Sequence, residues 1–399
     1  MDVTEEREKV RSNGKKSGAI LFVLLFIAIV FTAFTAYLKS IDANINLNNI
    51  KNLFNSTIQK GVVEEELKLR EIRYEAKDRP NFIVYKDLII KSTLHGITAI
   101  DKKGNEKWSF PIKMNKPLLK TKGLNLVAAD VGGTMVLAID QKGVKWEETL
   151  EGDIINADIS KKGFITVIHE VEGYKGIVRV FDPEGQEVFK RYIIDTFVFS
   201  GEVLPSGESV IINSIDISGI GATSCIEFTD LLGNPFAALL PRENLMYPFV
   251  FTLEDDSFSI ANDTSIICFD RNRNEVWEKK YKKVYSIDVI DDKLFIAAVS
   301  SNDTANTSEI LFITREGKVL KSYPLKREVN NISTYRDIVA INTGREVYFI
   351  NSKADLILKY NSLSDVLQVY FFSKDEAAIV TRNSVDIIKI QRGRDNELE

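Results

Sequence analysis

The 399-residue sequence predicts an all-β fold, an eight-bladed β-propeller of four-stranded blades, preceded by one transmembrane helix. Three observations support this prediction. A hairpin-like segment recurs about every 41 residues, a spacing that fits a four-stranded propeller blade and not a helical repeat. Each interval holds further strand-like runs, and one stretch near the N-terminus is apolar over its whole length.

The apolar stretch is residues 19–38, AILFVLLFIAIVFTAFTAYL. At ~1.5 Å rise per residue, a helix of this length crosses the ~30 Å hydrocarbon core of a bilayer. A cleaved signal peptide is the alternative, but it has a shorter apolar region and small residues at the −3 and −1 positions. Cleavage after Ala33 or Ala36 would put Phe31 or Phe34 at −3. We therefore expect an uncleaved helix over residues 17–38, with residues 19–38 in contact with the lipid bilayer.

The charges beside this segment predict its orientation. Five Lys and Arg residues lie in the tail, residues 1–16, against only Lys39 and Lys51 in the next stretch of chain. The positive-inside rule then places the tail in the cytoplasm. We expect a single-pass protein of the cell membrane whose remaining residues are extracytoplasmic. Residues 39–63 form a linker that either carries a short amphipathic helix or is a solvated stalk.

The β-propeller is expected over residues 64–395, which hold eight copies of the hairpin. The copies span residues 97–110, 136–148, 178–190, 226–238, 266–279, 311–321, 348–359 and 385–395. The last copy is weak, so seven blades is the fallback. Residues 64–74 alternate like a strand, and the final repeat ends without an outer strand. An N-terminal strand that completed the last blade would close the ring and remove exposed sheet edges.

The turn between the third and fourth strands has a recurrent chemistry. An Asp ends the third strand, a Gly three residues later supplies a positive φ angle, and a bulky residue follows on the outer strand. These structural repeat positions include Asp101, Gly104, Trp108, Asp140, Gly143, Trp146, Asp182, Gly185, Asp270 and Trp277. We expect the Trp side chains to dock between neighbouring blades. Where Arg273 and Ala354 replace the Gly, we expect a neighbouring Asn or Asp to take the strained conformation.

The copies AIDKKGNEKW (99–108) and AIDQKGVKW (138–146) resemble the tryptophan-docking signature of quinoprotein-type (PQQ-like) β-propellers. Lys103 and Lys142 stand where that family usually has Thr. The resemblance covers residues 65–395, and an anchor followed by such a propeller also looks like an uncharacterised family of membrane proteins of Gram-positive bacteria. The PQQ-like class holds both quinone-dependent dehydrogenases and non-catalytic scaffolds, so it does not decide the function. The dehydrogenases use a vicinal cysteine pair, whereas Cys225 and Cys268 lie 43 positions apart.

The sequence shows little sign of catalytic chemistry. His95 and His169 share no catalytic spacing with a nucleophile, and two Cys with two His do not form a zinc motif. The net charge of −5 is unsuited to nucleic acid. We therefore predict no catalytic residue, no cofactor, no metal site and no nucleic-acid partner.

Loop length points to a binding role. Three repeats have long loops between their second and third strands, at residues 170–176, 214–222 and 300–308. We expect them on the face that carries the blade-to-blade connections, with Tyr174, Ser218, Asn302 and Asn306 as candidate binding residues. Insertions without a role are the alternative. The predicted function is a membrane-anchored, extracytoplasmic binding or scaffolding module for an envelope protein or a cell-wall glycan. The alternative is an extracytoplasmic enzyme with a central-channel site, which predicts clustered carboxylates or a metal at the channel mouth.

Overall fold

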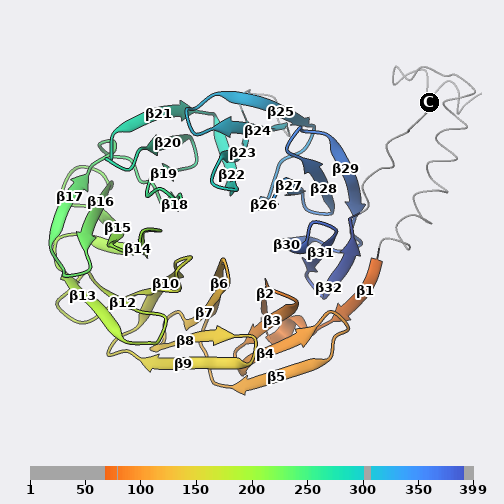
Figure 1. Cartoon of the computed structure of the whole chain (residues 1–399), viewed down its shortest axis with the longest axis horizontal. Helices are drawn as coiled ribbons and strands as arrows, with labels where there is room; N and C mark the ends of the chain where they lie inside the picture. Colours follow the sequence, from red (N-terminus) through yellow and green to blue (C-terminus); the bar gives the residue numbers. More distant parts are fainter. Residues whose placement is uncertain (1–67, 79, 301–306, 391–399) are drawn as a thin grey trace, which may run out of the picture. The chain divides into compact units, whose positions relative to one another are not determined.

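A computed structural model describes residues 68–78, 80–300 and 307–390 of the chain. These residues form eight antiparallel sheets of four strands each around a central axis, as Figure 1 shows. The prediction of an eight-bladed propeller is confirmed, and the seven-bladed fallback is excluded. Within each sheet, neighbouring strands follow one another in the sequence from the innermost to the outermost, except in the last blade.

The first four blades are formed by sixteen consecutive strands. Blade 1 holds β2 (Asn81–Tyr85), β3 (Leu88–Thr93), β4 (Gly96–Asp101) and β5 (Glu106–Pro111). Blade 2 holds β6 (Pro117–Lys122), β7 (Asn125–Asp130), β8 (Met135–Asp140) and β9 (Gly143–Thr149). Blade 3 holds β10 (Ile154–Ile159), β11 (Ile165–His169), β12 (Gly176–Phe181) and β13 (Glu187–Ile193). Blade 4 holds β14 (Phe197–Val203), β15 (Ser209–Asp216), β16 (Thr223–Asp230) and β17 (Pro235–Leu239).

The remaining blades continue around the ring. Blade 5 holds β18 (Phe249–Thr252), β19 (Phe258–Ala261), β20 (Ser265–Phe269) and β21 (Glu275–Lys280). Blade 6 holds β22 (Lys283–Ile290), β23 (Leu294–Ser300), β24 (Ser308–Thr314) and β25 (Val319–Leu325). Blade 7 holds β26 (Asn331–Tyr335), β27 (Ile338–Asn342), β28 (Glu346–Asn351) and β29 (Leu356–Asn361). Blade 8 holds β30 (Val366–Ser373), β31 (Glu376–Thr381), β32 (Ser384–Lys389) and β1 (Lys68–Arg73), and one 3₁₀ turn, η1 (Ala76–Asp78), follows β1.

The two ends of the propeller meet in blade 8. Strand β1 pairs antiparallel with β32 and lies outermost in the order β1-β32-β31-β30. Ile72 stands opposite Val385 in this ladder, and the N–H of Tyr74 donates to the carbonyl oxygen of Asn383 at 3.1 Å. The pairing covers the free edge of β32, so the ring is closed by hydrogen bonds between segments from opposite ends of the sequence.

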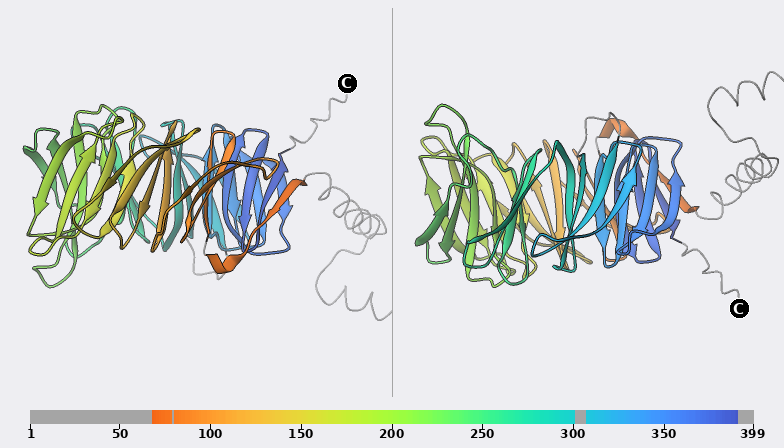
Figure 2. Two further views of the ribbon diagram at one scale, coloured as in Figure 1. Left: turned by 90° about the horizontal axis from the view of Figure 1, so that it is seen from below. Right: turned by 90° about the horizontal axis from the view of Figure 1, so that it is seen from above.

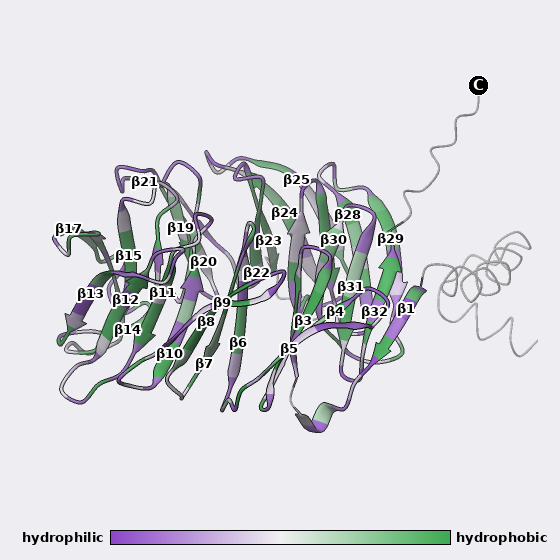
Figure 3. Cartoon of the chain, turned by 60° about the horizontal axis from the view of Figure 1, so that its bottom comes forward, coloured by the Kyte–Doolittle hydropathy of each residue, from purple (hydrophilic) through white to green (hydrophobic). Residues whose placement is uncertain are grey.

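The core lies between the blades. The second and third strands are almost continuously apolar, as in β27, because both of their faces are covered by neighbouring sheets. The outer strands alternate between exposed and partly buried positions, as in β9. Figure 3 shows this distribution, with hydrophobic residues along the inner strands and mostly hydrophilic residues in the turns. Each hydrophobic cluster joins two adjacent blades, so the ring is held by eight similar interfaces.

The repeated Asp residues organise the turns between third and fourth strands. The Oδ1 atom of Asp101 accepts the backbone N–H groups of Lys103 and Asn105 at 2.8 and 2.9 Å. Asp182 and Asp270 make the same pair of bonds, and Asp140 accepts one such bond, from Lys142 at 2.7 Å. These N–H groups favour the ionised carboxylate and, with the Lys107 ammonium as the largest influence, they lower the pKa of Asp101.

The three Trp residues dock on the turn of the next blade. The indole N–H groups of Trp108, Trp146 and Trp277 donate to the carbonyl oxygens of Gln141, Pro183 and Arg315 at 3.0, 3.1 and 2.8 Å. Gln141 and Arg315 directly follow the last residue of the third strand, and Pro183 lies two residues after it. A Cβ atom on Gly185 would lie 2.9 Å from the Trp146 ring, and one on Gly317 would lie 2.7 Å from Trp277. These glycines therefore permit both the positive φ and the close approach of the ring.

One expectation about these turns is wrong. Arg273 and Ala354 themselves adopt positive φ angles of 69° and 66°, and no neighbouring Asn or Asp takes the strain for them. The reason is that the hydrogen bonds of the turn fix which position is left-handed: the N–H of Arg273 donates to the carbonyl oxygen of Asp270, and that of Ala354 to Asn351, both at 2.9 Å. Each of these turns holds several hydrogen bonds, and losing them together would cost more than the ~1–2 kcal/mol of backbone strain at one residue.

The ring has two distinct faces, seen edge-on in Figure 2. The turn face carries the hairpins between first and second strands and those between third and fourth strands. The connection face carries the loops between second and third strands together with the connections from each blade to the next. Residues 170–175 and 217–222 are loops of the connection face, as expected, although residues 214–216 extend β15 and do not belong to the loop.

Candidate functional site

Exposed apolar side chains gather on the connection face over blades 3 and 4. We define the connection-face patch as Tyr174, Ile194, Phe197, Ile217, Ile220 and Leu245. Tyr174 comes from the loop of blade 3, and Ile217 and Ile220 come from the loop of blade 4. Ile194 and Leu245 come from the blade-to-blade connections, and Phe197 is the first residue of β14. Ile220 is fully exposed, and 59% of the surface of Ile194 is exposed. Apolar residues of this size are seldom grouped on a surface without a role in association.

Hydrogen bonds hold the loops of the patch against the connections. The N–H of Lys175 donates to the carbonyl oxygen of Ile193 at 2.8 Å, and the N–H of Ser224 donates to that of Leu245 at 3.0 Å. The Lys175 ammonium lies 5.0 Å from the centre of the Phe197 ring. The Tyr174 ring lies 4.7 Å from the ring of Tyr192. The patch is therefore a structured surface in which loop and connection support each other.

The structure describes only two of the four loop residues that the sequence suggested as binding residues. Tyr174 is 40% exposed and belongs to the patch. Ser218 is exposed, and its N–H donates to Oδ1 of Asp216 at 2.8 Å, which lowers the pKa of that carboxyl. Asn302 and Asn306 lie outside the described residues. The repeat positions, in contrast, lie at the turns and outer strands, where the Asp residues bond their own turns and the Trp residues contact the next blade.

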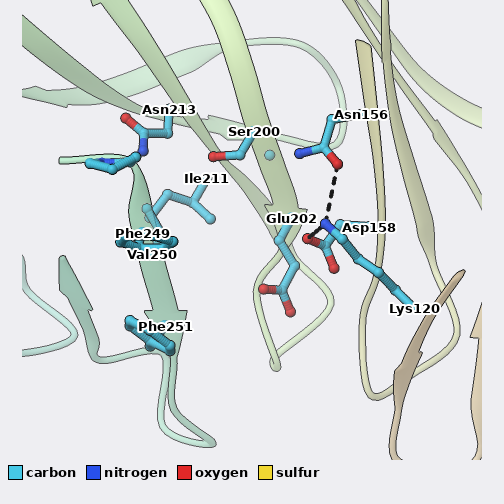
Figure 4. Close-up of a pocket in the computed structure, with 12 residues that line it drawn as sticks. Lys120, Asn156, Asp158, Ser200, Glu202, Ile211, Asn213, Phe249, Val250 and Phe251 are labelled. Carbon is cyan, nitrogen blue, oxygen red and sulfur yellow. Dashed lines mark hydrogen bonds and ion pairs between the residues drawn. The ribbon is translucent and has the colours of Figure 1, made fainter. Parts of the chain in front are cut away.

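A second feature is a pocket of about 320 Å³ in the central channel, which we call the channel pocket. Its walls come from strands β6, β10, β14, β15 and β18. Figure 4 shows a polar wall with Asn156 and Asp158 facing an apolar wall with Phe249 and Phe251. The pocket is amphipathic in the manner of many ligand sites, with an apolar surface and a few polar groups.

Two lysine–carboxylate pairs lie along the polar wall. The Lys120 ammonium lies 2.8 Å from Oδ2 of Asp158 and also donates to Oδ1 of Asn156 at 3.2 Å. Lys122 pairs with Glu202 and donates to Oγ1 of Thr252 at 3.0 Å. Burial raises the pKa of Glu202, with a further contribution in the same direction from the charge of Asp158.

Ion pairs also cross the lumen at the turn face. Lys161, in the turn between β10 and β11, pairs with Glu254 of blade 5 and lies 2.8 Å from Oδ2 of Asp292 in blade 6. These contacts join blade 3 to blades on the other side of the channel, so they narrow its turn-face end. The channel pocket is consequently more accessible from the connection face.

A third feature, the neighbouring pocket, lies on the other side of β18. It has a volume of about 250 Å³ and shares Phe249 and Phe251 with the channel pocket. Its other lining residues include Asn262, Tyr285 and Asn331. The short strand β18 stands apart from β14 and β22, whereas the inner strands of most other adjacent blades pack closely together. Both pockets occupy the gaps that this separation leaves.

The prediction of candidate residues missed the polar wall of the channel. A signal was present, because Lys120, Asp158 and Glu202 are charged residues inside first strands that are otherwise mostly apolar. Only the ring brings these strands together. Cys225 and Cys268 are free thiols, the first half-buried and the second buried. His169 is buried and neither ring nitrogen has a hydrogen-bond partner, whereas His95 lies exposed in a turn.

Metal-binding and membrane-spanning features are absent from the described part of the chain. No group of three or more His, Cys, Asp or Glu side chains in residues 68–78, 80–300 and 307–390 is arranged to hold a metal ion. In the same ranges no helix has the length and apolar character needed to cross a bilayer. The tail, the predicted helix over residues 17–38 and the linker lie outside these ranges.

The closed ring of eight four-stranded blades defines a β-propeller protein. Residues 62–390 match the model of DUF5711, a family of unknown function, and the chain belongs to that family. A search among curated proteins found no match.

Solved structures share the fold at low sequence identity. BamB from Moraxella catarrhalis is 12% identical with a TM-score of 0.53, over 81% of this chain and 99% of that chain. Sqt1 from Saccharomyces cerevisiae is 10% identical with a TM-score of 0.63, over 82% of this chain and 100% of that chain. Sqt1 from Chaetomium thermophilum, bound to the N-terminus of ribosomal protein L10, is 12% identical with a TM-score of 0.54, over 76% and 94% of the two chains.

Proposed function

We propose that this protein is a single-pass membrane protein that displays its propeller outside the cell and binds an envelope protein through the connection-face patch. The observation that carries the proposal is the patch itself, in which exposed apolar side chains from two adjacent blades gather on one face. Aromatic residues such as Tyr174 and Phe197 are enriched at the centre of protein–protein interfaces, where apolar surface is buried.

The apolar segment 19–38 and the excess of Lys and Arg before it support the membrane anchor and its orientation. The indole–carbonyl docking of three blades supports a kinship with the PQQ-like propellers. A related architecture also binds protein: the Chaetomium Sqt1 structure holds the N-terminus of a ribosomal protein. Binding of a protein by a propeller of this architecture is therefore physically reasonable.

Site-specific photo-crosslinking in the native membrane tests the proposal. A crosslinking amino acid at position 220, and separately at position 197, should capture the same partner, identified by mass spectrometry. Ile220→Asp combined with Tyr174→Ala should abolish capture from position 197. Leu232→Asp is the matched control, because Leu232 is 89% exposed but lies in a turn-face hairpin of the same blade. Capture of unrelated proteins from the two positions, or equal loss in the control, would contradict the proposal.

The alternative of an enzyme with a central-channel site predicted clustered carboxylates, and Asp158 and Glu202 do line the channel pocket. Each of them, however, is paired with a lysine. In each pair the ammonium occupies an oxygen that would otherwise attack a substrate or transfer a proton. We therefore favour binding over catalysis for this site.

A further inference from the structure

We propose that the channel pocket and the neighbouring pocket form one site for a neutral, hydroxyl-rich ligand, a short oligosaccharide. The inference rests on the proposed binding role of the connection face, but it concerns residues other than those of the connection-face patch.

Phe249 links the two pockets. It lines both of them, and 56% of its surface is exposed although it begins an inner strand. Tyr285 lines the neighbouring pocket on the far side of this ring. The face of an aromatic ring is electron-rich and attracts the weakly positive C–H groups of a pyranose. Volumes of about 320 and 250 Å³ together provide room for more than one sugar residue.

Two side-chain amides have acceptor oxygens without a partner. Nδ2 of Asn213, in the channel pocket, donates to the carbonyl oxygen of Tyr247 at 2.8 Å. Nδ2 of Asn331, in the neighbouring pocket, donates to that of Leu367 at 3.0 Å. Because a carbonyl oxygen can only accept a hydrogen bond, the NH₂ end of each amide must face it, and this fixes the position of the Oδ1 atom.

The Oδ1 atoms of Asn213 and Asn331 are buried and have no hydrogen-bond partner among the described residues. Asn213 as a whole is only 1% exposed. A buried acceptor without a donor is costly, so a small movement of the pocket wall that let a ligand O–H or N–H group reach either oxygen would be favoured. Asn213 belongs to β15 and Asn331 to β26, so the two amides lie in the pockets on either side of β18.

The charges of the site balance. Asp158 and Glu202 are neutralised by Lys120 and Lys122, so the polar wall has no net charge to attract an ion. A charged ligand would have to break one of these pairs in a partly buried setting. Excess acceptors, aromatic faces and zero net charge together favour a neutral polyol over a nucleotide, an amine or an acidic peptide.

Saturation-transfer NMR and titration calorimetry on the full-length chain test this site. The chain is held in a detergent without a sugar headgroup, because a glycoside detergent would compete. The probes are N,N′-diacetylchitobiose, cellobiose and, as a peptide of similar size, acetyl-trialanine amide. We expect at least one disaccharide to bind in the millimolar range or tighter, and the peptide not to bind.

The variants locate the site. Phe249→Ala should weaken disaccharide binding about tenfold, and Ser200→Ala should weaken it severalfold, because the Ser200 hydroxyl lines the channel pocket. Leu363→Ala is the control, since Leu363 is a fully exposed apolar residue in the connection between β29 and β30 that lines neither pocket, and binding should stay within about twofold of wild type. Unchanged melting temperatures show that each variant is folded.

Absence of disaccharide binding, binding of the peptide instead, or binding that Phe249→Ala leaves unchanged would overturn the inference. These outcomes are separable from failure of the proposed function. Loss of partner crosslinking from positions 197 and 220 would leave disaccharide binding intact, and loss of disaccharide binding would leave crosslinking intact.

Discussion

Trp277 should be the most costly of the three docking Trp residues to remove. It is 9% exposed, packs edge-on against Phe295 with ring centres 5.6 Å apart, and contacts the backbone of Gly317 across the interface of blades 5 and 6. Its indole N–H donates to the carbonyl oxygen of Arg315 at 2.8 Å. Replacement by Ala leaves a cavity at this interface and an acceptor without its donor.

The expected loss follows from these contacts. Removing a buried Trp side chain costs about 3–5 kcal/mol of the free energy of unfolding, and the indole hydrogen bond contributes about 1 kcal/mol of it. Trp277→Phe keeps most of the ring and loses the hydrogen bond, so we expect it to cost about 1–2 kcal/mol. At about 2 °C per kcal/mol for a large domain, Trp277→Ala should lower Tm by about 6–10 °C.

Urea unfolding of the full-length chain in detergent, followed by circular dichroism, measures these losses without depending on Trp fluorescence. Trp108→Ala is the matched control, because Trp108 makes the same indole–carbonyl bond but is more exposed and lies about 4.0 Å from the position of a Cβ on Gly143. We expect a smaller loss for Trp108→Ala. Equal losses at the two sites, or a loss below about 1 kcal/mol for Trp277→Ala, would refute the docking argument.

Three further predictions concern pH, closure and topology. Burial lowers the pKa of His169, which lies near Glu151, Arg179 and Lys190, so the folded state binds fewer protons than the unfolded state. The free energy of unfolding should therefore fall as pH drops below about 6.5. Urea unfolding at pH 5 and pH 7 should show a smaller difference in this free energy for His169→Leu than for wild type. Deleting β1 uncovers the edge of β32, so we expect faster hydrogen exchange in β32 and oligomers by size-exclusion chromatography, but neither in Arg73→Ala. In a Cys225→Ser background, a membrane-impermeant maleimide should label Lys142→Cys in intact cells but not Ser12→Cys; the reverse pattern would contradict the predicted topology.

The turns show which structural features can be predicted from residues that lie close together in the sequence. Asp101 and Gly104 specify a hairpin through bonds between residues a few positions apart, so the repeat and the blade count could be predicted. The identity of the left-handed residue at Arg273 was not predictable from propensity alone, because the hydrogen bonds of the turn outweigh the preference of a single residue. The docking partner of the last blade was also missed. Ile72 of β1 contacts Gly104 of blade 1, where blades 1, 2 and 5 use a Trp to contact the next blade.

Some features of the candidate site could likewise be predicted from the sequence, and others could not. The loops at residues 170–175 and 217–222 are visible as long insertions between strands, and their shared face follows from the regular alternation of a propeller. The two pockets are not visible, because Lys120, Asp158, Glu202 and Phe249 come from four different blades. Nothing in the local sequence of any one of these strands indicates how far apart the inner strands will stand.

The amino-acid sequence by itself determined the repeat, the number of blades and the chemistry of each turn, since these depend on residues close together in the chain. The tertiary structure alone decided what lies inside the ring. The cross-channel ion pairs of Lys122 and Lys161, the isolation of β18 and the unpartnered oxygens of Asn213 and Asn331 depend on contacts between blades. Such contacts are set by the closure of the whole ring, and no single repeat contains the information that specifies them.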